Sequence, residues 1–223
     1  MSKKVLPPPL PPETRTVGQL VAETLKLYGD NLWPSLALGI SLTVINQITA
    51  GHPTLFQVLV LAAGAPLMAA SFTGASAIVG GVRPRTKDVV RAIVVGSIVF
   101  APAAFLTLLF VLPAVAWLAL VGLVVPVLVL ERPGVGAAFR RAIQLARADY
   151  IHALGSLATL AILFGLVKLT LVLLLRDLGD MGERAALGLG DLVMSPLLFL
   201  GGALLYVDQA ARVGSGSRAE RRR

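Results

Sequence analysis

Residues 92–130 read AIVVGSIVFAPAAFLTLLFVLPAVAWLALVGLVVPVLVL and contain no Lys, Arg, Asp or Glu. An α-helix rises 1.5 Å per residue, so one helix of this length would be roughly 58 Å long, about twice the thickness of a bilayer's hydrocarbon core. The stretch therefore predicts two membrane-spanning helices. Pro113 is the best candidate for the break, because an internal proline ends or kinks a helix. We expect the turn within residues 107–113.

The rest of the chain is similarly apolar. AVILMFWYC residues make up 56% of the sequence and DEKR residues 14%, whereas soluble domains carry about 25% charged residues. A bilayer crossing needs about 20 apolar residues. The sequence therefore predicts an all-α integral membrane bundle of six transmembrane helices with cytosolic amphipathic lead-in helices. The four other predicted spans are residues 32–50, 55–80, 150–175 and 187–207.

The sequence contains little that points to enzyme chemistry. It has no cysteine and two histidines, His52 and His152, which excludes disulfides, thiolate metal sites and cysteine nucleophiles. Phosphate-binding loops, nucleophile elbows, zinc-protease motifs and dinucleotide-binding glycine patterns are all missing from it. We therefore expect a protein that is not an enzyme, with no catalytic residue, no cofactor and no metal.

Two segments outside the spans have the pattern of amphipathic helices. Residues 17–28 follow Thr16, which with Gln19 forms a predicted capping box. Residues 135–149 place Arg140, Arg141 and Arg147 opposite an apolar stripe. These arginines are candidate contacts for anionic lipid headgroups, each contributing about 1 kcal/mol near a membrane surface. A second interpretation is that this helix is topogenic and anchors the fold, and the two are compatible.

The distribution of Lys and Arg predicts the orientation. Seventeen of the 20 basic residues lie in segments that six spans would place on one side, and two lie on the other. Cytosolic loops of membrane proteins carry this excess, so both termini are expected in the cytosol, in a multi-pass protein of the bacterial plasma membrane. The net charge of +8 would suggest nucleic acid in a soluble protein. Here the charges flank spans, so we expect the lipid bilayer as partner and no nucleic acid.

The chain divides into three predicted regions. Residues 1–15 include a proline-rich run that cannot form the apolar core of a signal peptide, and we expect a disordered cytosolic tail. Residues 16–210 form the six-span membrane domain. Residues 211–223 form a basic cytosolic tail.

Lys168 is the ionisable residue deepest within a predicted span, and Asp191 lies at comparable depth on the next one. A charge at the centre of a membrane helix costs about 2.5–3.5 kcal/mol on insertion scales, so such a residue is a functional candidate. Lys168 has three interpretations: it extends to the outer interface, it forms an ion pair with Asp191, or it has a transport or substrate role. Asp208, at the inner end of the last span, is expected to pair with Arg140, Arg141 or Arg147.

Residues 124–145, VVPVLVLERPGVGAAFRRAIQL, resemble part of a known group of proteins. The segment is similar to bacterial six-span proteins related to the membrane domain of glycerophosphoryl diester phosphodiesterases, which carry an acid-Arg-Pro turn after span four and then a basic helix. Residues 16–31 and 205–208 are similar too. The resemblance implies a six-span architecture in a bacterial plasma membrane. No catalytic residue is carried over, because the chain has no segment that would form the family's histidine- and glutamate-rich catalytic barrel.

These observations favour a non-enzymatic integral membrane protein that acts as a scaffold or accessory subunit. The alternative is a small transporter or permease subunit, which a polar pathway near the middle of the membrane would favour. Protein partners are not identified by the sequence.

Overall fold

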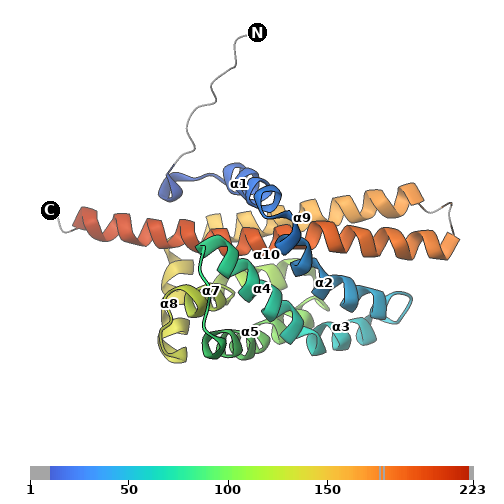
Figure 1. Cartoon of the computed structure of the whole chain (residues 1–223), viewed down its shortest axis with the longest axis horizontal. Helices are drawn as coiled ribbons and strands as arrows, with labels where there is room; N and C mark the ends of the chain where they lie inside the picture. Colours follow the sequence, from blue (N-terminus) through green and yellow to red (C-terminus); the bar gives the residue numbers. More distant parts are fainter. Residues whose placement is uncertain (1–10, 176, 178, 221–223) are drawn as a thin grey trace, which may run out of the picture.

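The computed structural model describes residues 11–175, 177 and 179–220, and its elements there are all helical (Figure 1). The short 3-10 helix η1 comes first and is followed by ten α-helices in the described chain. Their bounds are η1 Pro12–Thr14, α1 Val17–Asp30, α2 Leu32–Thr49, α3 Thr54–Ala63, α4 Ala65–Gly80, α5 Thr86–Leu106, α6 Val111–Val121, α7 Val124–Leu130, α8 Val135–Ala148, α9 Tyr150–Leu175 and α10 Gly179–Glu220.

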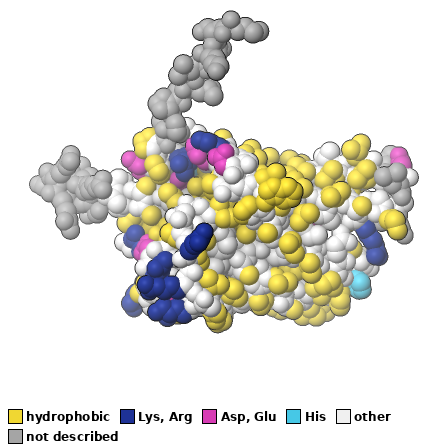
Figure 2. Space-filling view, viewed as in Figure 1, with side chains coloured by type: hydrophobic (Ala, Val, Ile, Leu, Met, Phe, Trp, Pro, Cys, Tyr) yellow, Lys and Arg dark blue, Asp and Glu magenta, His cyan; other side chains and the backbone are white. Residues whose placement is uncertain are grey.

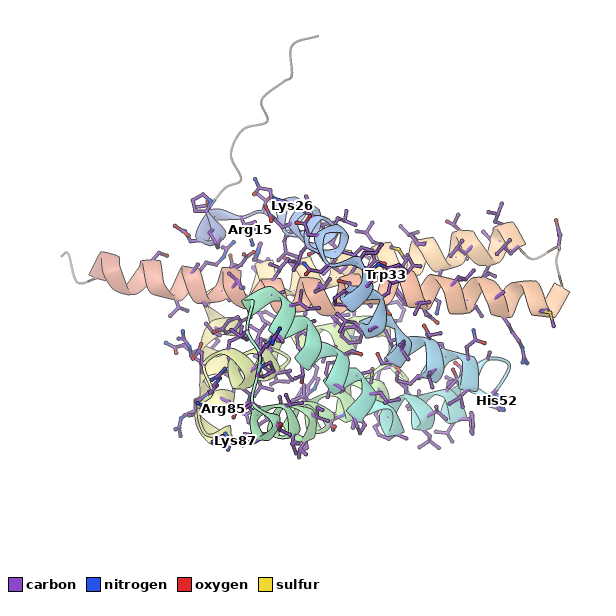
Figure 3. All side chains as sticks on the ribbon, viewed as in Figure 1. Arg15, Lys26, Trp33, His52, Arg85 and Lys87 are labelled. Atoms are coloured by element: carbon purple, nitrogen blue, oxygen red, sulfur yellow. The ribbon has the colours of Figure 1, made fainter. Side chains whose placement is uncertain are left out.

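Five helical segments of the described chain are long and apolar enough to cross a membrane, and the pair α3 and α4 adds a sixth if it is one span. The two helices of that pair are bent by 52°. Figure 3 shows His52, just before the pair, and Arg85, just after it, near opposite ends of the long axis of the bundle. The chain is therefore an all-α, multi-pass membrane protein. The five segments are Leu32–Thr49, Thr86–Leu106, Val111–Leu130, Tyr150–Leu175 and Arg184–Ser215.

Two predicted spans are broken at glycines. Gly64 separates α3 from α4, and a Cβ there would overlap the side chain of Ile45. Gly122 and Leu123 separate α6 from α7. The turn after α5 lies within the predicted region, but Pro113 is not the break. It lies in the first turn of α6, where a proline's missing N–H removes no hydrogen bond of the helix.

Helix α10 lies at the centre of the bundle and packs against α2, α4 and α9. Close approach depends on small residues. A Cβ on Gly39 of α2 would overlap the backbone carbonyl of Leu192 on α10, and one on Gly201 would overlap Leu160 of α9. Small residues permit such contacts between membrane helices, where packing rather than the hydrophobic effect holds helices together.

The outward face of α9 is apolar along most of its length. Its side chains at Ile162, Leu166 and Leu174 are exposed, and Figure 2 shows hydrophobic side chains spread over the surface of the spanning region. Large contiguous apolar surfaces of this kind are rare on soluble monomers. They suit contact with lipid.

The segments at the two ends of the chain differ from the predicted boundaries. Residues 1–10 and 221–223, which belong to the predicted tails, lie outside the described residues. Residues 12–14 form η1, which packs against α10, so the packed part begins before residue 16. Helix α10 continues to Glu220, past the boundary predicted at residue 210.

Candidate functional site

The two residues singled out within the spans lie in direct contact. The Lys168 Nζ is 2.7 Å from the Asp191 Oδ1. The second carboxylate oxygen of Asp191 accepts a hydrogen bond of 2.8 Å from the Asn46 side-chain amide. Asp191 is fully buried, and the side chain of Lys168 is 20% exposed. The structure thus joins α2, α9 and α10 through one carboxylate.

Local packing explains how these three helices bring polar groups together. Gly39 lets the backbones of α2 and α10 approach at Leu192, and Asn46 lies two turns further along the same helix. The side chain of Lys168 passes close to Gly190, which leaves room for it. Ser195, one turn beyond Asp191, donates its hydroxyl to the Asp191 carbonyl at 2.6 Å. The interface is therefore built from small residues that surround one ion pair.

The polar groups of this cluster contact one another and form a closed cluster, in which they are not left open to a ligand. Each oxygen of the Asp191 carboxylate faces a donor, and the ammonium of Lys168 also lies 5.2 Å from the centre of the Phe164 ring. Such an arrangement neutralises two charges that would otherwise be costly in lipid. Sequence reasoning matched the depths of Lys168 and Asp191 but missed Asn46. A lone Asn in an apolar span was the available signal, yet the direction it faces depends on packing.

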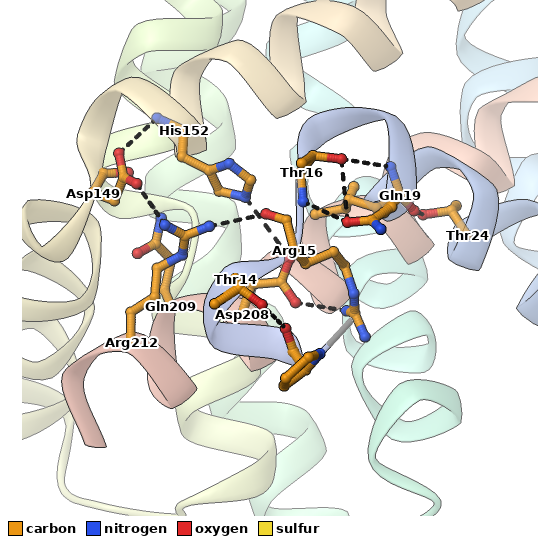
Figure 4. A network of polar contacts seen from close by, with 12 residues as sticks. Thr14, Arg15, Thr16, Gln19, Thr24, Asp149, His152, Asp208, Gln209 and Arg212 are labelled. Atoms are coloured by element: carbon orange, nitrogen blue, oxygen red, sulfur yellow. Dashed lines mark hydrogen bonds and ion pairs between the residues drawn. The ribbon is translucent and has the colours of Figure 1, made fainter. Parts of the chain in front are cut away.

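A second polar cluster lies where the N-terminal segment meets α10 (Figure 4). Arg15 Nη1 lies 2.6 Å from Asp208 Oδ1, and His152 Nε2 lies 3.8 Å from Asp208 Oδ2. Arg212 binds Asp149 at 2.6 Å and donates to the Arg15 carbonyl at 3.0 Å. These contacts fasten η1 and the start of α1 to α9 and α10.

The pairing predicted for Asp208 with an arginine of α8 is wrong. Asp208 is fully buried and faces Arg15 rather than the amphipathic helix. The physical reason is that η1 packs against α10 and brings a basic residue from far away in the sequence onto this face. Sequence periodicity does not report such a contact.

The three arginines of α8 have different surroundings. Arg141 lies 3.2 Å from Glu131 and donates to Gln144 at 3.0 Å. Arg140 and Arg147 are exposed, and within the described part of the chain neither has an ion-pair partner.

Arg140 and Arg147 border a shallow depression of about 390 Å³ whose floor includes Ile143 and Val213. Figure 2 shows Lys and Arg side chains gathered at the end of the molecule that carries α8. An apolar floor between two free guanidinium groups suits an amphipathic molecule with a negative group.

The Glu131 side chain, in the turn before α8, makes a second contact. It accepts a hydrogen bond of 2.8 Å from the hydroxyl of Tyr206 on α10. Arg141 and Tyr206 therefore hold the same carboxylate from two helices. This contact fixes the position of α8 against the spans and gives Arg141 a structural role.

Among the described residues, no three His, Cys, Asp or Glu side chains lie close enough together to hold a metal ion. Comparison of the chain with protein-family models, with curated proteins and with solved structures finds no match. The resemblance to the membrane domain of glycerophosphoryl diester phosphodiesterases stays a prediction.

Proposed function

We propose that this chain is a non-enzymatic integral membrane protein that acts as a scaffold or accessory subunit in a bacterial plasma membrane. The observation that carries the proposal is the closure of the intramembrane polar cluster. The Asp191 carboxylate binds both the Lys168 ammonium and the Asn46 amide at a junction of three helices. A transport pathway uses such groups differently, because there they face a water-filled cavity or a substrate.

The proposed orientation has both termini in the cytosol. The excess of basic residues at the end that carries α8 supports it, because positively charged segments stay on the cytosolic side. In this orientation Arg140 and Arg147 meet the anionic headgroups of the inner leaflet. Arg141 is bound to Glu131, so we assign the headgroup contacts to the other two arginines.

The test uses cysteine labelling, for which the natural absence of cysteine provides a clean background. Ser195 is fully buried next to the ion pair, and Ser195→Cys is close to isosteric. A membrane-impermeant maleimide applied to right-side-out or inverted vesicles should leave this thiol unlabelled, since the reagent needs a hydrated thiolate. The control, Met181→Cys at the exposed start of α10, should react from one side. Labelling of residue 195 from both sides would contradict a closed scaffold.

One observation favours the alternative of a small transporter. The breaks at Gly64 and Gly122 interrupt two spans, and interrupted helices are typical of transporters. Transporters place polar helix ends at such breaks to bind substrate, whereas the residues around these two breaks are apolar. The labelling of residue 195 distinguishes the two functions.

A further inference from the structure

An apolar cavity of about 450 Å³ lies inside the spanning region, with walls mainly from α5, α6, α9 and α10 and further side chains from α2, α3 and α4. Among the described side chains that line it, Thr107 supplies the single hydroxyl, which donates to the Ala104 carbonyl at 2.6 Å. The cavity thus offers no free polar group to a ligand. An apolar cavity of this kind stays empty of water, because a bound water needs two to four polar partners.

The cavity exists because small residues occupy its walls where larger ones would meet. The buried rings of Phe72, Phe100 and Phe199 line it, with the ring centres of Phe72 and Phe100 6.0 Å apart. The break between α6 and α7 at Gly122 also borders it. The small residues of the walls are Ala103, Ala104, Ala114, Ala161, Gly165 and Gly202.

The cavity reaches the surface between the start of α6 and the middle of α9. Val111, which lines it, is 56% exposed, and Gly165 on the facing helix is exposed. Leu109 and Phe110, in the neighbouring turn, are also exposed. An uncharged turn that presents large apolar side chains suits lipid better than water.

The depth of this opening is set by the neighbouring hairpin. Helix α9 continues from Gly165 to Leu175, which at 1.5 Å per residue places its end about 15 Å further along the bundle. Figure 1 shows α9 and α10 extending beyond α5 at this end. The opening therefore lies inside the hydrocarbon layer, on the side opposite the basic end.

We propose that this cavity binds one hydrocarbon chain of a membrane phospholipid, which enters from the leaflet opposite the basic end. The atoms that line an empty cavity lose the dispersion contacts they would make in a filled one. A lipid tail that enters through the opening restores these contacts. A partner helix does not fit, because one turn of a helix 10 Å wide with a 5.4 Å pitch already occupies roughly 420 Å³. The cavity therefore has room for about one helical turn and not for a whole helix. The proposal applies to a scaffold and to a transporter alike.

The experiment uses the full chain reconstituted in vesicles that contain phosphatidylcholine with a photoreactive diazirine near the end of one acyl chain. After irradiation, mass spectrometry locates the cross-links. Label is expected on the cavity wall, at Ala161 and Leu157, and on Ile162, which faces outward and reports ordinary contact with lipid.

The substitution Ala161→Phe fills the cavity. It should lower the cross-linking of Leu157 at least tenfold and leave that of Ile162 unchanged, whereas the control Leu163→Phe, on the outward face of the same helix, should change neither. If Ala161→Phe does not fold, Ala114→Leu fills the cavity from the opposite wall and should give the same result. Label on Ile162 without label on the wall, or wall label that survives a folded cavity-filling variant, would overturn the proposal. A photoreactive free fatty acid that labels the wall more strongly than the phospholipid would overturn the assignment to a membrane phospholipid.

Discussion

Replacing Lys168 by Met should destabilise the bundle more than any other change to its intramembrane polar cluster. Among the described residues, the substitution leaves the fully buried Asp191 carboxylate with the Asn46 amide as its remaining side-chain donor. Removing one partner of a buried pair costs about 3–5 kcal/mol. Lys168 is 20% exposed and the hydrogen bond from Asn46 remains. We therefore expect the free energy of unfolding to fall by about 3 kcal/mol, at the lower end of that range.

The reciprocal substitution Asp191→Asn should cost less. It leaves Lys168 without its counter-ion, but this side chain has a long stem and is partly exposed, so it can extend toward the outer interface. We expect the free energy of unfolding to fall by about 1–2 kcal/mol. This is the insertion cost of a membrane lysine, reduced because the side chain can reach the interface. The double variant Lys168→Met with Asp191→Asn has no buried charge at this junction. It should recover about 1–3 kcal/mol relative to the sum of the single changes.

The free energy of unfolding can be measured by titration with a denaturing detergent in mixed micelles. Thr170→Val serves as the control, because Thr170 is an exposed residue of α9 whose hydroxyl bonds within its own helix; it should change stability by less than about 0.5 kcal/mol. The reasoning would be refuted by additive losses, or by a greater loss from Asp191→Asn than from Lys168→Met.

Two further substitutions test other contacts. Gly39→Ala should separate α2 from α10, because the added Cβ overlaps the Leu192 carbonyl. It should lower the free energy of unfolding by about 1–3 kcal/mol in the same titration. Unchanged stability would contradict the close packing of the two helices. Changing Arg140 and Arg147 together to Gln should weaken the retention of anionic lipid by about 2 kcal/mol, measured as the ratio of anionic to neutral lipid that co-purifies with the protein. The matched control Arg141→Gln should retain anionic lipid as the unaltered chain does, and equal losses in both variants would argue against assigning headgroup binding to the two free arginines.

The sequence was most informative about the lengths of the spanning helices and the depths of residues within them. Hydropathy alone predicted α9 at residues 150–175, and the structure has Tyr150–Leu175. The capping box of Thr16 and Gln19 is present as predicted. These features depend on residues close together in the chain, so they can be read locally.

Features set by packing between distant segments were not predictable. The break at Gly64 depends on the side chain of Ile45 in another helix, and the partner of Asp208 is Arg15, at the opposite end of the chain. The depths of Lys168 and Asp191 followed from hydropathy, while the contribution of Asn46 requires knowing which way α2 faces. The apolar cavity likewise arises from small residues on four helices, none of which is unusual in its own segment.

The crossing of the membrane by the bent pair α3 and α4 determines the topology. If the pair is one span, the chain crosses six times and both ends lie on the same side of the membrane; if it is re-entrant, the ends lie on opposite sides. Single cysteines at His52, Lys87, Met181 and Ser215 can be labelled in intact cells with an impermeant maleimide. We predict labelling at residues 52 and 181 and none at residues 87 and 215. Labelling at residue 87 or 215 from outside would contradict six crossings with both ends in the cytosol.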